Sequence, residues 1–310
     1  MSEQPAVLPS TVSLGQLRVH IVSDGEFRLD GGSMFGVVPK TLWERVCPAD
    51  ERNRIRMATN CLLIEANREL VLVDSGMGTK LTPKECSIYG VDPQRKNLLD
   101  SIAALGFHPE DVTAVATSHL HFDHCGWLTR LTPAGSLVPT FPKAKYFLET
   151  GELAHARDPN ERDRASYWSR NWEPLFEGGQ VELFEERITV ASGVELLKAP
   201  GHNRDMCVIT LDGGAGLRGI FLADLVPLAA HVPLPWIMAY DLYPLTTLEQ
   251  KKRWLPRLAR ERWVCFFEHD PRVPVGWIEE EAEGKFRAHA GLPRFEAQEV
   301  VEVARGGRVS

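Results

Sequence analysis

Four side chains that bind transition metals fall within six consecutive positions of the chain. The segment T-S-H-L-H-F-D-H-C-G contains His119, His121, Asp123 and His124. Imidazole nitrogens and carboxylate oxygens are donors that zinc and related divalent ions take from proteins. In an extended segment alternate side chains share one side, so His119 and His121 can converge on one ion. A turn after them would direct Asp123 and His124 at a neighbouring ion, and the pattern therefore predicts a site for two metals.

Three isolated residues further along are candidates for completing this site. They are His202 in A-P-G-H-N, Asp224 in F-L-A-D-L and His269 in F-F-E-H-D. Each follows an apolar, strand-like run or a Pro-Gly turn. Because tens of residues separate them, only a fold that gathers strand ends at one sheet edge can bring them together.

The elements that must position these residues are mostly strands. A short apolar run at 112–117 directly precedes the histidine segment and is typical of a buried strand. Before it, 60–66 and 69–74 are predicted to form a hairpin with a tight turn at 67–68, and 96–105 has helical periodicity that ends at Gly106. Further strands are expected at 17–23, 145–148, 181–184, 187–190, 194–198, 207–211, 219–222 and 263–267, with a helix at 247–260 capped by Thr247. Many strands with fewer helices predict a layered α/β architecture.

Two longer segments interrupt this pattern within what we expect to be one domain of residues 1–310. Residues 29–59 carry glycines, charges and a Pro-initiated helical turn at 39–46, and are predicted to form an N-terminal loop insertion. Residues 160–177 are predicted to form a helical insertion, with the helix itself at 161–176.

Aromatic residues are concentrated in this second segment. Trp168, Trp172 and Phe176 are spaced by four residues and would share one face of the helix, next to Tyr167. Such stripes usually pack on the core or on a dimer partner. Because the rest of the segment is polar, the alternative is an aromatic lid beside the metal site.

Composition excludes several classes of partner. The chain has 35 Lys and Arg against 42 Asp and Glu, a net charge of −7, whereas nucleic-acid binding is built on Lys and Arg. We therefore expect no nucleic-acid partner. The six cysteines include no C-x-x-C pair, which argues against a disulfide framework. The N-terminal residues lack signal-peptide features and no stretch reaches 18 apolar residues, which predicts a cytoplasmic protein without membrane contact.

The motif H-x-H-x-D-H, followed by a distant His, an Asp and a final His, resembles the metallo-β-lactamase superfamily over residues 17–270. The resemblance implies an αββα sandwich with the metals at the strand edge. It assigns the first ion to His119, His121 and His202, the second to Asp123, His124 and His269, and the bridging position to Asp224. Two zinc ions are expected, although Mn, Fe or Co would accept the same donors.

Further residues acquire expected roles from this resemblance. Asp74 in L-V-D-S-G-M-G matches the family's first motif, where the acid supports the metal loop without binding metal. Cys125 is expected to pack under that loop, with a nucleophilic role as the alternative. His231 lies in a Pro- and Trp-rich stretch and is a candidate for lining the substrate site. Acyl-homoserine lactonases of the superfamily carry a catalytic tyrosine soon after the bridging Asp; none follows Asp224 closely, which leaves Tyr240 as the alternative.

The resemblance implies a hydrolase in which a metal-bridging hydroxide attacks the substrate and Asp123 carries a proton to the leaving group. Residues 29–59 and the apolar stretch after Asp224 are similar to the lactonase and methyl-parathion-hydrolase-like branch. This predicts a small-molecule lactone or carboxylic ester as substrate, and the branch also implies a homodimer formed through 29–59. Organophosphate triesters and thioesters are the alternative substrates. A metal-binding protein without catalysis is the alternative outside the enzymes.

Overall fold

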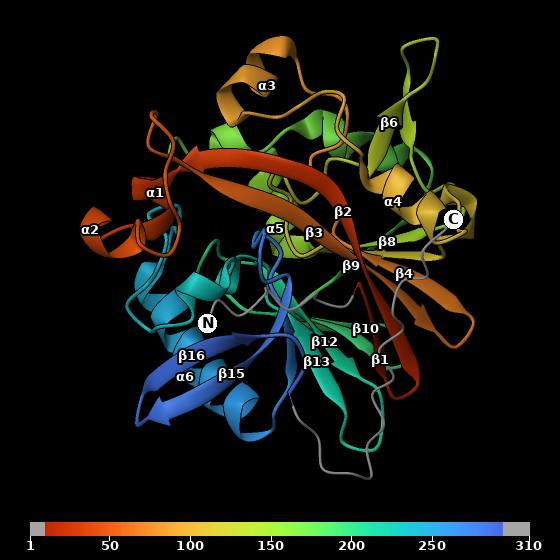
Figure 1. Ribbon diagram of the computed structural model, residues 1–310. Coiled ribbons are helices and arrows are strands. Elements are labelled where there is room, and N and C mark those ends of the chain that lie inside the picture. The colour runs from red at the N-terminus through yellow and green to blue at the C-terminus, as the bar shows by residue number, and fades with distance from the viewer. Residues whose placement is uncertain (1–9, 294–310) are drawn as a thin grey trace, which may run out of the picture.

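Two β-sheets packed face to face form the body of the protein (Figure 1). The computed structural model describes residues 10–293. The first sheet has seven strands in the order β1-β2-β3-β4-β5-β8-β9, with bounds Thr11–Leu14, Leu17–Asp30, Arg54–Ala66, Glu69–Val73, Ala114–Ala116, Lys145–Glu149 and Val181–Phe184. The second sheet has seven strands in chain order, β10 to β16, with bounds Arg187–Ala191, Val194–Lys198, Cys207–Asp212, Arg218–Phe221, Val264–Phe266, Val275–Ala282 and Lys285–Ala290. A separate hairpin pairs β6 (Thr129–Leu131) with β7 (Leu137–Pro139).

The strand directions bring several loops to one edge of the sandwich. In the first sheet, β4, β5, β8 and β9 run parallel to one another, and in the second sheet β13 is parallel to β14. The other neighbouring strands are antiparallel. Parallel neighbours end at the same edge of a sheet, so the segments after β4 and β5, and those after β13 and β14, start side by side. Crevices outside the carboxyl ends of such strands are common ligand sites.

Apolar side chains fill the space between the sheets. Successive strand residues point to opposite faces, so Leu62 and Ile64 of β3 join Ile220 of β13 in the core between the sheets, whereas Leu63 faces the other way. Both faces of β3 are therefore buried. This explains why its sequence is a nearly continuous apolar run with little alternation.

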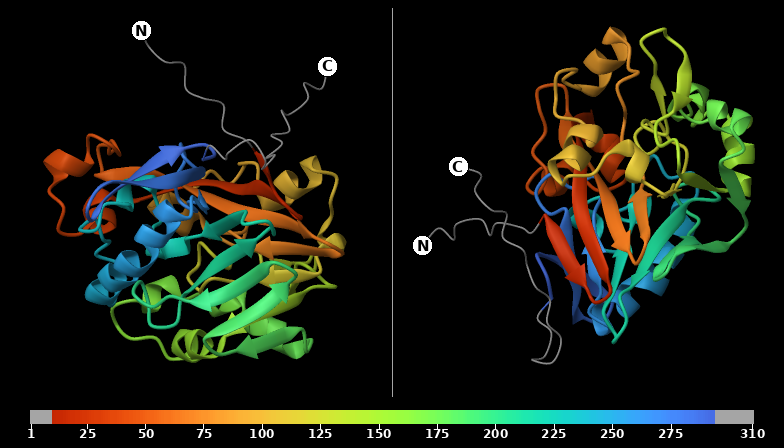
Figure 2. Two further views of the ribbon diagram at one scale, coloured as in Figure 1. Left: turned by 90° about the horizontal axis from the view of Figure 1, so that it is seen from below. Right: turned by 90° about the vertical axis from the view of Figure 1, so that its right-hand side faces the viewer.

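Helices cover the two outer faces of the sandwich (Figure 2). The α-helices are α1 (Gly31–Phe35), α2 (Lys40–Trp43), α3 (Pro83–Tyr89), α4 (Leu98–Ala104), α5 (Thr150–Arg157) and α6 (Pro244–Arg260). The 3₁₀-helices are η1 (Pro109–Asp111), η2 (Arg164–Ser166), η3 (Ser169–Asn171), η4 (Glu173–Glu177), η5 (Ala223–Leu225) and η6 (Ala229–His231). Ile102 of α4 and Leu153 of α5 pack with Leu63 on the first sheet, and Trp254 and Leu258 of α6 pack on the second. The predicted αββα sandwich is thus confirmed.

Residues 29–59 do not form the single long insertion that was predicted. Strand β2 continues to Asp30, which pairs with Arg54 at the start of β3, so only 31–53 lie outside the sheet, mainly in α1 and α2. Phe27, Ile55 and Met57 are buried in a separate apolar cluster with Met34 and Trp43, so this end of the two strands packs on the helical segment between them. The charged residues between these apolar positions had concealed the strand ends in the sequence.

The predicted helix at 161–176 is also wrong, because the segment forms the three short helices η2, η3 and η4. Trp172 at the start of η4 has non-helical dihedral angles and is followed by Pro174, which can open a new turn but cannot continue a helix. Trp168, Trp172 and Phe176 therefore do not share one helix face.

Helix α6 begins one turn before the predicted Thr247, with Tyr243 as its N-cap residue and Pro244 at its first position, where proline is favoured. The predicted turn at 67–68 is present, with Asn67 in the left-handed region at φ 58°. Within residues 10–293, no helix combines the length and the apolar content needed to cross a membrane.

Candidate metal centre

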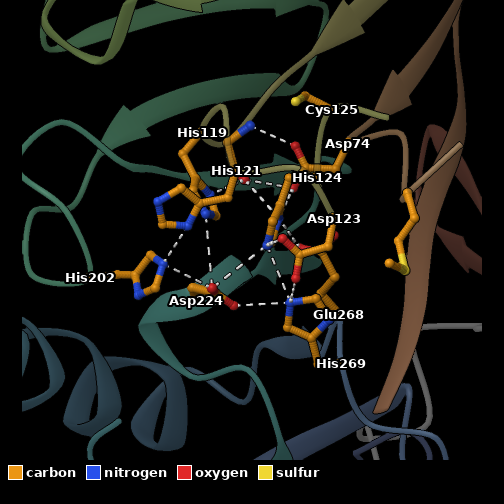
Figure 3. A network of polar contacts seen from close by, with 12 residues as sticks. Asp74, His119, His121, Asp123, His124, Cys125, His202, Asp224, Glu268 and His269 are labelled. Atoms are coloured by element: carbon orange, nitrogen blue, oxygen red, sulfur yellow. Dashed lines mark hydrogen bonds and ion pairs between the residues drawn. The ribbon is translucent and has the colours of Figure 1, made fainter. Parts of the chain in front are cut away.

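Loops at one edge of the sandwich bring all seven candidate ligands together (Figure 3). The segment after β5 carries His119, His121, Asp123 and His124, the β11–β12 connection carries His202, η5 after β13 carries Asp224, and the segment after β14 carries His269. Each of the seven is at most 8% exposed. Residues dispersed over much of the chain thus form one buried cluster.

The first group of ligands consists of His119, His121, His202 and Asp224, whose donor atoms all lie within 4.8 Å of one another. Nε2 of His202 lies 3.0 Å from Nδ1 of His121 and 3.1 Å from Oδ2 of Asp224. One divalent cation could contact all four side chains in this arrangement.

The second group consists of Asp123, His124 and His269, again with donor atoms within 4.8 Å. Nε2 of His269 lies 3.2 Å from Nε2 of His124 and 3.2 Å from Oδ1 of Asp224. The Asp224 carboxylate therefore lies between the two groups, with Oδ2 near His202 and, at 3.6 Å, His124, and with Oδ1 near His269. This is the position that a bridging carboxylate needs.

The cluster attracts positive charge. Burial and neighbouring imidazoles hold the pKa of His119 and His121 well below its usual range, so both are neutral, the form that binds metals. Burial opposes ionisation of Asp224, but His202 and His269 outweigh this effect and hold the Asp224 pKa well below its usual range. Burial likewise opposes charge on His269, yet Asp224 raises its pKa to about 9. The ionised carboxylate thus favours cations on both sides, whether protons or metal ions.

Unpaired polar atoms in the cluster test whether a metal fits. Nε2 of His119 is buried and has no hydrogen-bond partner, and Oδ1 of Asp224 is buried and has only its ion-pair contact with His269 at 3.2 Å. Buried polar atoms are normally paired, because an unpaired one costs about 1–3 kcal/mol. Divalent cations would satisfy both atoms, and a set of nitrogen and oxygen donors suits zinc, manganese, iron or cobalt. The residues present therefore fit two divalent ions.

Asp74 supports the histidine segment from behind. Its Oδ1 accepts a hydrogen bond from the Ser118 backbone N–H at 2.6 Å, its Oδ2 accepts one from the Ser118 hydroxyl at 2.6 Å, and Oδ2 also lies 3.0 Å from Nδ1 of His124. Asp74 thus fixes the backbone before the first ligand and orients His124, in agreement with the supporting role that the resemblance implied.

Two further acidic residues, Asp241 and Glu268, touch the ligands and were missed in the sequence. Oδ1 of Asp241 lies 3.0 Å from Nδ1 of His202. Oε2 of Glu268 lies 2.9 Å from Nδ1 of His124, and burial raises the pKa of Glu268 to about 8 despite the opposing effect of His124. In the sequence, Glu268 follows two phenylalanines and directly precedes His269. A charged residue at the end of such an apolar run needs a buried partner, and this signal could have identified it. Asp241 had no comparable signal.

The ligand cluster borders an open cavity of about 460 Å³, a size typical of sites for small molecules. Its walls are largely apolar and include Leu29, Met34, Met57, Phe122 and Met238. Tyr89, Tyr240 and Arg162 also line it. Tyr240, the alternative to a tyrosine directly after Asp224, therefore lines the same cavity as the candidate ligands.

Two candidates have structural roles instead. His231 is buried, stacks on Phe35 with ring centroids 4.7 Å apart, and donates from Nε2 to the Met34 carbonyl at 2.7 Å. Burial lowers the pKa of His231 to about 3, so it is neutral, and it is not among the residues that line the cavity. Burial raises the pKa of the Cys125 thiol to about 12, which favours packing over a nucleophilic role.

The aromatic residues of 160–177 divide between the core and the layer of side chains next to the cavity lining. Trp172 is 1% exposed and packs under the first sheet. Tyr167 contacts His121 edge-on with ring centroids 4.7 Å apart, and Trp168 stacks on Phe122 at 4.5 Å. The packing interpretation is therefore right for Trp172, whereas Tyr167 and Trp168 contact residues that line the site.

Comparison with known proteins identifies the family. The profile of the Metallo-beta-lactamase superfamily matches residues 54–269, more than half of the chain. The protein belongs to this superfamily, as its motif and fold both predicted.

Curated relatives match at low identity. The chain is 26% identical over 206 residues to a protein of Mycobacterium tuberculosis named "Probable metallo-hydrolase", covering 59% of this chain and 63% of the relative. It is 25% identical over 229 residues to an N-acyl homoserine lactonase of Bacillus thuringiensis, covering 68% and 80%. The match thus spans less than two thirds of the first relative's length.

Solved structures share the fold over nearly the whole chain. A probable metal-dependent hydrolase from Staphylococcus aureus superposes with a TM-score of 0.83 at 29% identity, covering 91% of this chain and 98% of that one. The dizinc quorum-quenching lactonase AidC, in complex with a homoserine product, superposes with a TM-score of 0.74 at 22% identity, covering 92% and 98%. The latter likeness shows the fold alone.

Proposed function

We propose that the protein is a hydrolase that uses two divalent metal ions, preferably zinc, to cleave a lactone or carboxylic ester. The observation that carries the proposal is the position of Asp224, whose carboxylate lies between the two ligand groups at the edge of an apolar cavity. His119, His121 and His202 would hold one ion, Asp123, His124 and His269 the other, with Asp224 between them. The lactonase relatives and the hydrolase neighbours support the same class.

When bound there, two divalent ions supply a water of lowered pKa and an electrophile for the carbonyl group. The chain's own residues supply the rest. Asp123 lines the cavity, where its carboxyl group passes a proton to the departing oxygen. Tyr240 lines the same cavity and offers a phenol to the carbonyl or leaving oxygen. Both groups act on the departing or polarised oxygen, so they matter most for substrates with poor leaving groups.

The cavity lining supports a neutral, partly apolar substrate. Met34, Met57 and Met238 present flexible thioether side chains, which adapt to different acyl groups. Arg162 is exposed at the cavity and donates from Nη2 to the Ala239 carbonyl at 2.5 Å, so part of its hydrogen-bonding capacity is already used. An acyl lactone or aryl ester fits these surroundings better than a highly charged molecule.

A hydrolysis panel on metal-quantified protein tests the proposal. Lactones of several acyl lengths, aryl esters, thioesters and phosphotriesters would be compared for kcat/KM, with Asp224→Ala as the inactive variant and Asp158→Ala, at an exposed position on the end of α5, as its matched control. We expect lactones or esters to be turned over by the wild type and the control. Preference for phosphotriesters or thioesters would overturn the substrate class. No turnover by fully loaded protein would favour a metal-binding protein without catalysis.

A further inference from the structure

The side chain of Lys251, on α6, is an amine enclosed by backbone carbonyl groups. Lys251 is 1% exposed, and its Nζ donates to the carbonyl oxygens of His231 at 2.6 Å, Pro233 at 2.7 Å, Leu234 at 3.2 Å and Trp236 at 3.0 Å. All four acceptors belong to one short stretch of chain. The stretch therefore curves around a single nitrogen, as a loop curves around a bound cation.

This arrangement is unusual for a buried lysine, which normally requires a carboxylate partner because an unpaired buried charge is costly. Burial lowers the pKa of Lys251 to about 7, while the negative charge of Asp241 favours the charged form. The four carbonyl oxygens replace the water oxygens that burial removes. An ammonium group has three N–H donors, and without them these carbonyls would lose their partner in the interior.

The enclosed stretch continues directly into one wall of the cavity. Met238, Ala239 and Tyr240 line the cavity, and we call the whole segment 231–240 the pocket wall, although its residues 231–237 lie behind the lining. Ala239 donates from its backbone N–H to the Ser33 carbonyl at 2.8 Å. His231, at the other end of the wall, donates to the carbonyl of Met34. Ser33 and Met34 also line the cavity, so these two hydrogen bonds connect the pocket wall with α1.

The same helix holds a metal ligand one turn earlier. The Thr247 hydroxyl donates to Oδ2 of Asp241 at 2.6 Å, and Oδ1 of Asp241 contacts His202. Gly201, with φ 151°, packs so closely that a Cβ atom would lie 2.4 Å from Oγ1 of Thr247. Residues 247 and 251 are one turn apart on α6, so they lie on the same face of the helix. This face therefore contacts both the pocket wall and the β11–β12 connection that carries His202.

We propose that Lys251 is a positioning residue whose ammonium group acts as an internal cation, fixing the pocket wall and thereby the acyl-group selectivity of the site. The selectivity part rests on the proposed hydrolase function. The cation part does not, because it concerns the conformation of residues 231–240 alone. Lys251 touches no substrate and contributes only through the backbone that it holds.

Lys251→Met tests the charge, since methionine has similar length but cannot donate hydrogen bonds. Lys252→Met is the matched control, because Lys252 is the next residue, is exposed and pairs with Glu249 on the helix surface. Hydrogen exchange followed by mass spectrometry should show faster exchange in the pocket wall for Lys251→Met and not for the control. In the hydrolysis panel, KM for long acyl groups should rise about tenfold with a smaller change in kcat, the size expected when one apolar contact is lost. Wild-type exchange and wild-type KM in a folded Lys251→Met protein would overturn the proposal.

Lys251→Ala keeps the proposal testable even if the first variant folds poorly. The substitution removes a propylammonium group, so added n-propylammonium chloride should restore the folded fraction and slow exchange in the pocket wall, whereas uncharged n-propanol should not. Equal effects of the two additives would show that the site needs volume and no charge, and would overturn the proposal. If the wild type hydrolyses nothing in the panel, the proposed function fails, while exchange and rescue still decide the role of Lys251.

Discussion

Oε2 of Glu268 lies 2.9 Å from Nδ1 of His124, and both side chains are fully buried. The same nitrogen lies 3.0 Å from Oδ2 of Asp74. The opposite ring nitrogen, Nε2, faces Asp224 and His269. Two carboxyl groups thus hold the outer nitrogen of one candidate metal ligand. Such contacts fix the ring orientation and the tautomer and increase the basicity of the coordinating nitrogen.

Glu268→Gln should therefore weaken metal binding above about pH 8, where Glu268 is ionised and glutamine is not, while leaving the volume of the side chain almost unchanged. We expect about a 10–100-fold loss of affinity, the usual effect of removing a group that supports a metal ligand. Competition with a chromophoric chelator measures it. Glu69→Gln, at an exposed position, is the control. Equal affinity of Glu268→Gln and wild type would show that Asp74 alone suffices.

The cluster predicts about two transition-metal ions per chain. Asp224 faces both ligand groups, so Asp224→Ala should lower the metal content and affect both ions rather than one. Elemental analysis after dialysis against zinc checks the stoichiometry. Full activity with a single bound ion would exclude the binuclear assignment, and unchanged metal content in Asp224→Ala would exclude its bridging position.

Asp123→Asn separates coordination from proton transfer. If the carboxyl group passes a proton to the departing oxygen, the loss of kcat/KM should be larger for alkyl lactones, whose alkoxide requires a proton, than for nitrophenyl esters. The comparison is made at measured metal content, with Asp158→Asn as the surface control. Equal losses for both substrates, with metal retained, would contradict the proton-transfer role.

The fold was predictable mainly where apolar residues occupy most positions of a strand. Strands β9 and β11 were predicted with their observed bounds, Val181–Phe184 and Val194–Lys198, and the hairpin of β3 and β4 was recognised from its two apolar runs. Strand β15 (Val275–Ala282) was missed because its second half is acidic and exposed, so it shows little apolar periodicity. It is ordered by pairing with β14 and β16, which are contacts that no local pattern contains.

The residues of the candidate site were likewise predictable only where a local sequence pattern contains them. The histidine segment was visible because its ligands are nearly adjacent, whereas the contact of Asp241 with His202 depends on the turn before α6. Thr247 illustrates the difference. It was read as a helix cap from local preference, but its hydroxyl donates to Asp241, and Tyr243 takes the N-cap position. Long-range packing assigned the side chain a different partner.

The last prediction concerns Trp168 and Trp172, two tryptophans of 160–177 that differ in burial and in the residues they contact. Trp172→Ala should destabilise the protein by about 3–5 kcal/mol, since it removes a fully buried indole and leaves a cavity. Trp168 is only partly buried, stacks on Phe122, which lines the cavity, and also contacts the guanidinium of Arg170. Trp168→Ala should cost less stability and instead change KM across a series of acyl lengths, because the Phe122 ring loses its stacking partner. Urea unfolding and the substrate series measure the two effects separately. Similar loss of stability in both variants, with unchanged selectivity in Trp168→Ala, would show that both rings serve packing alone.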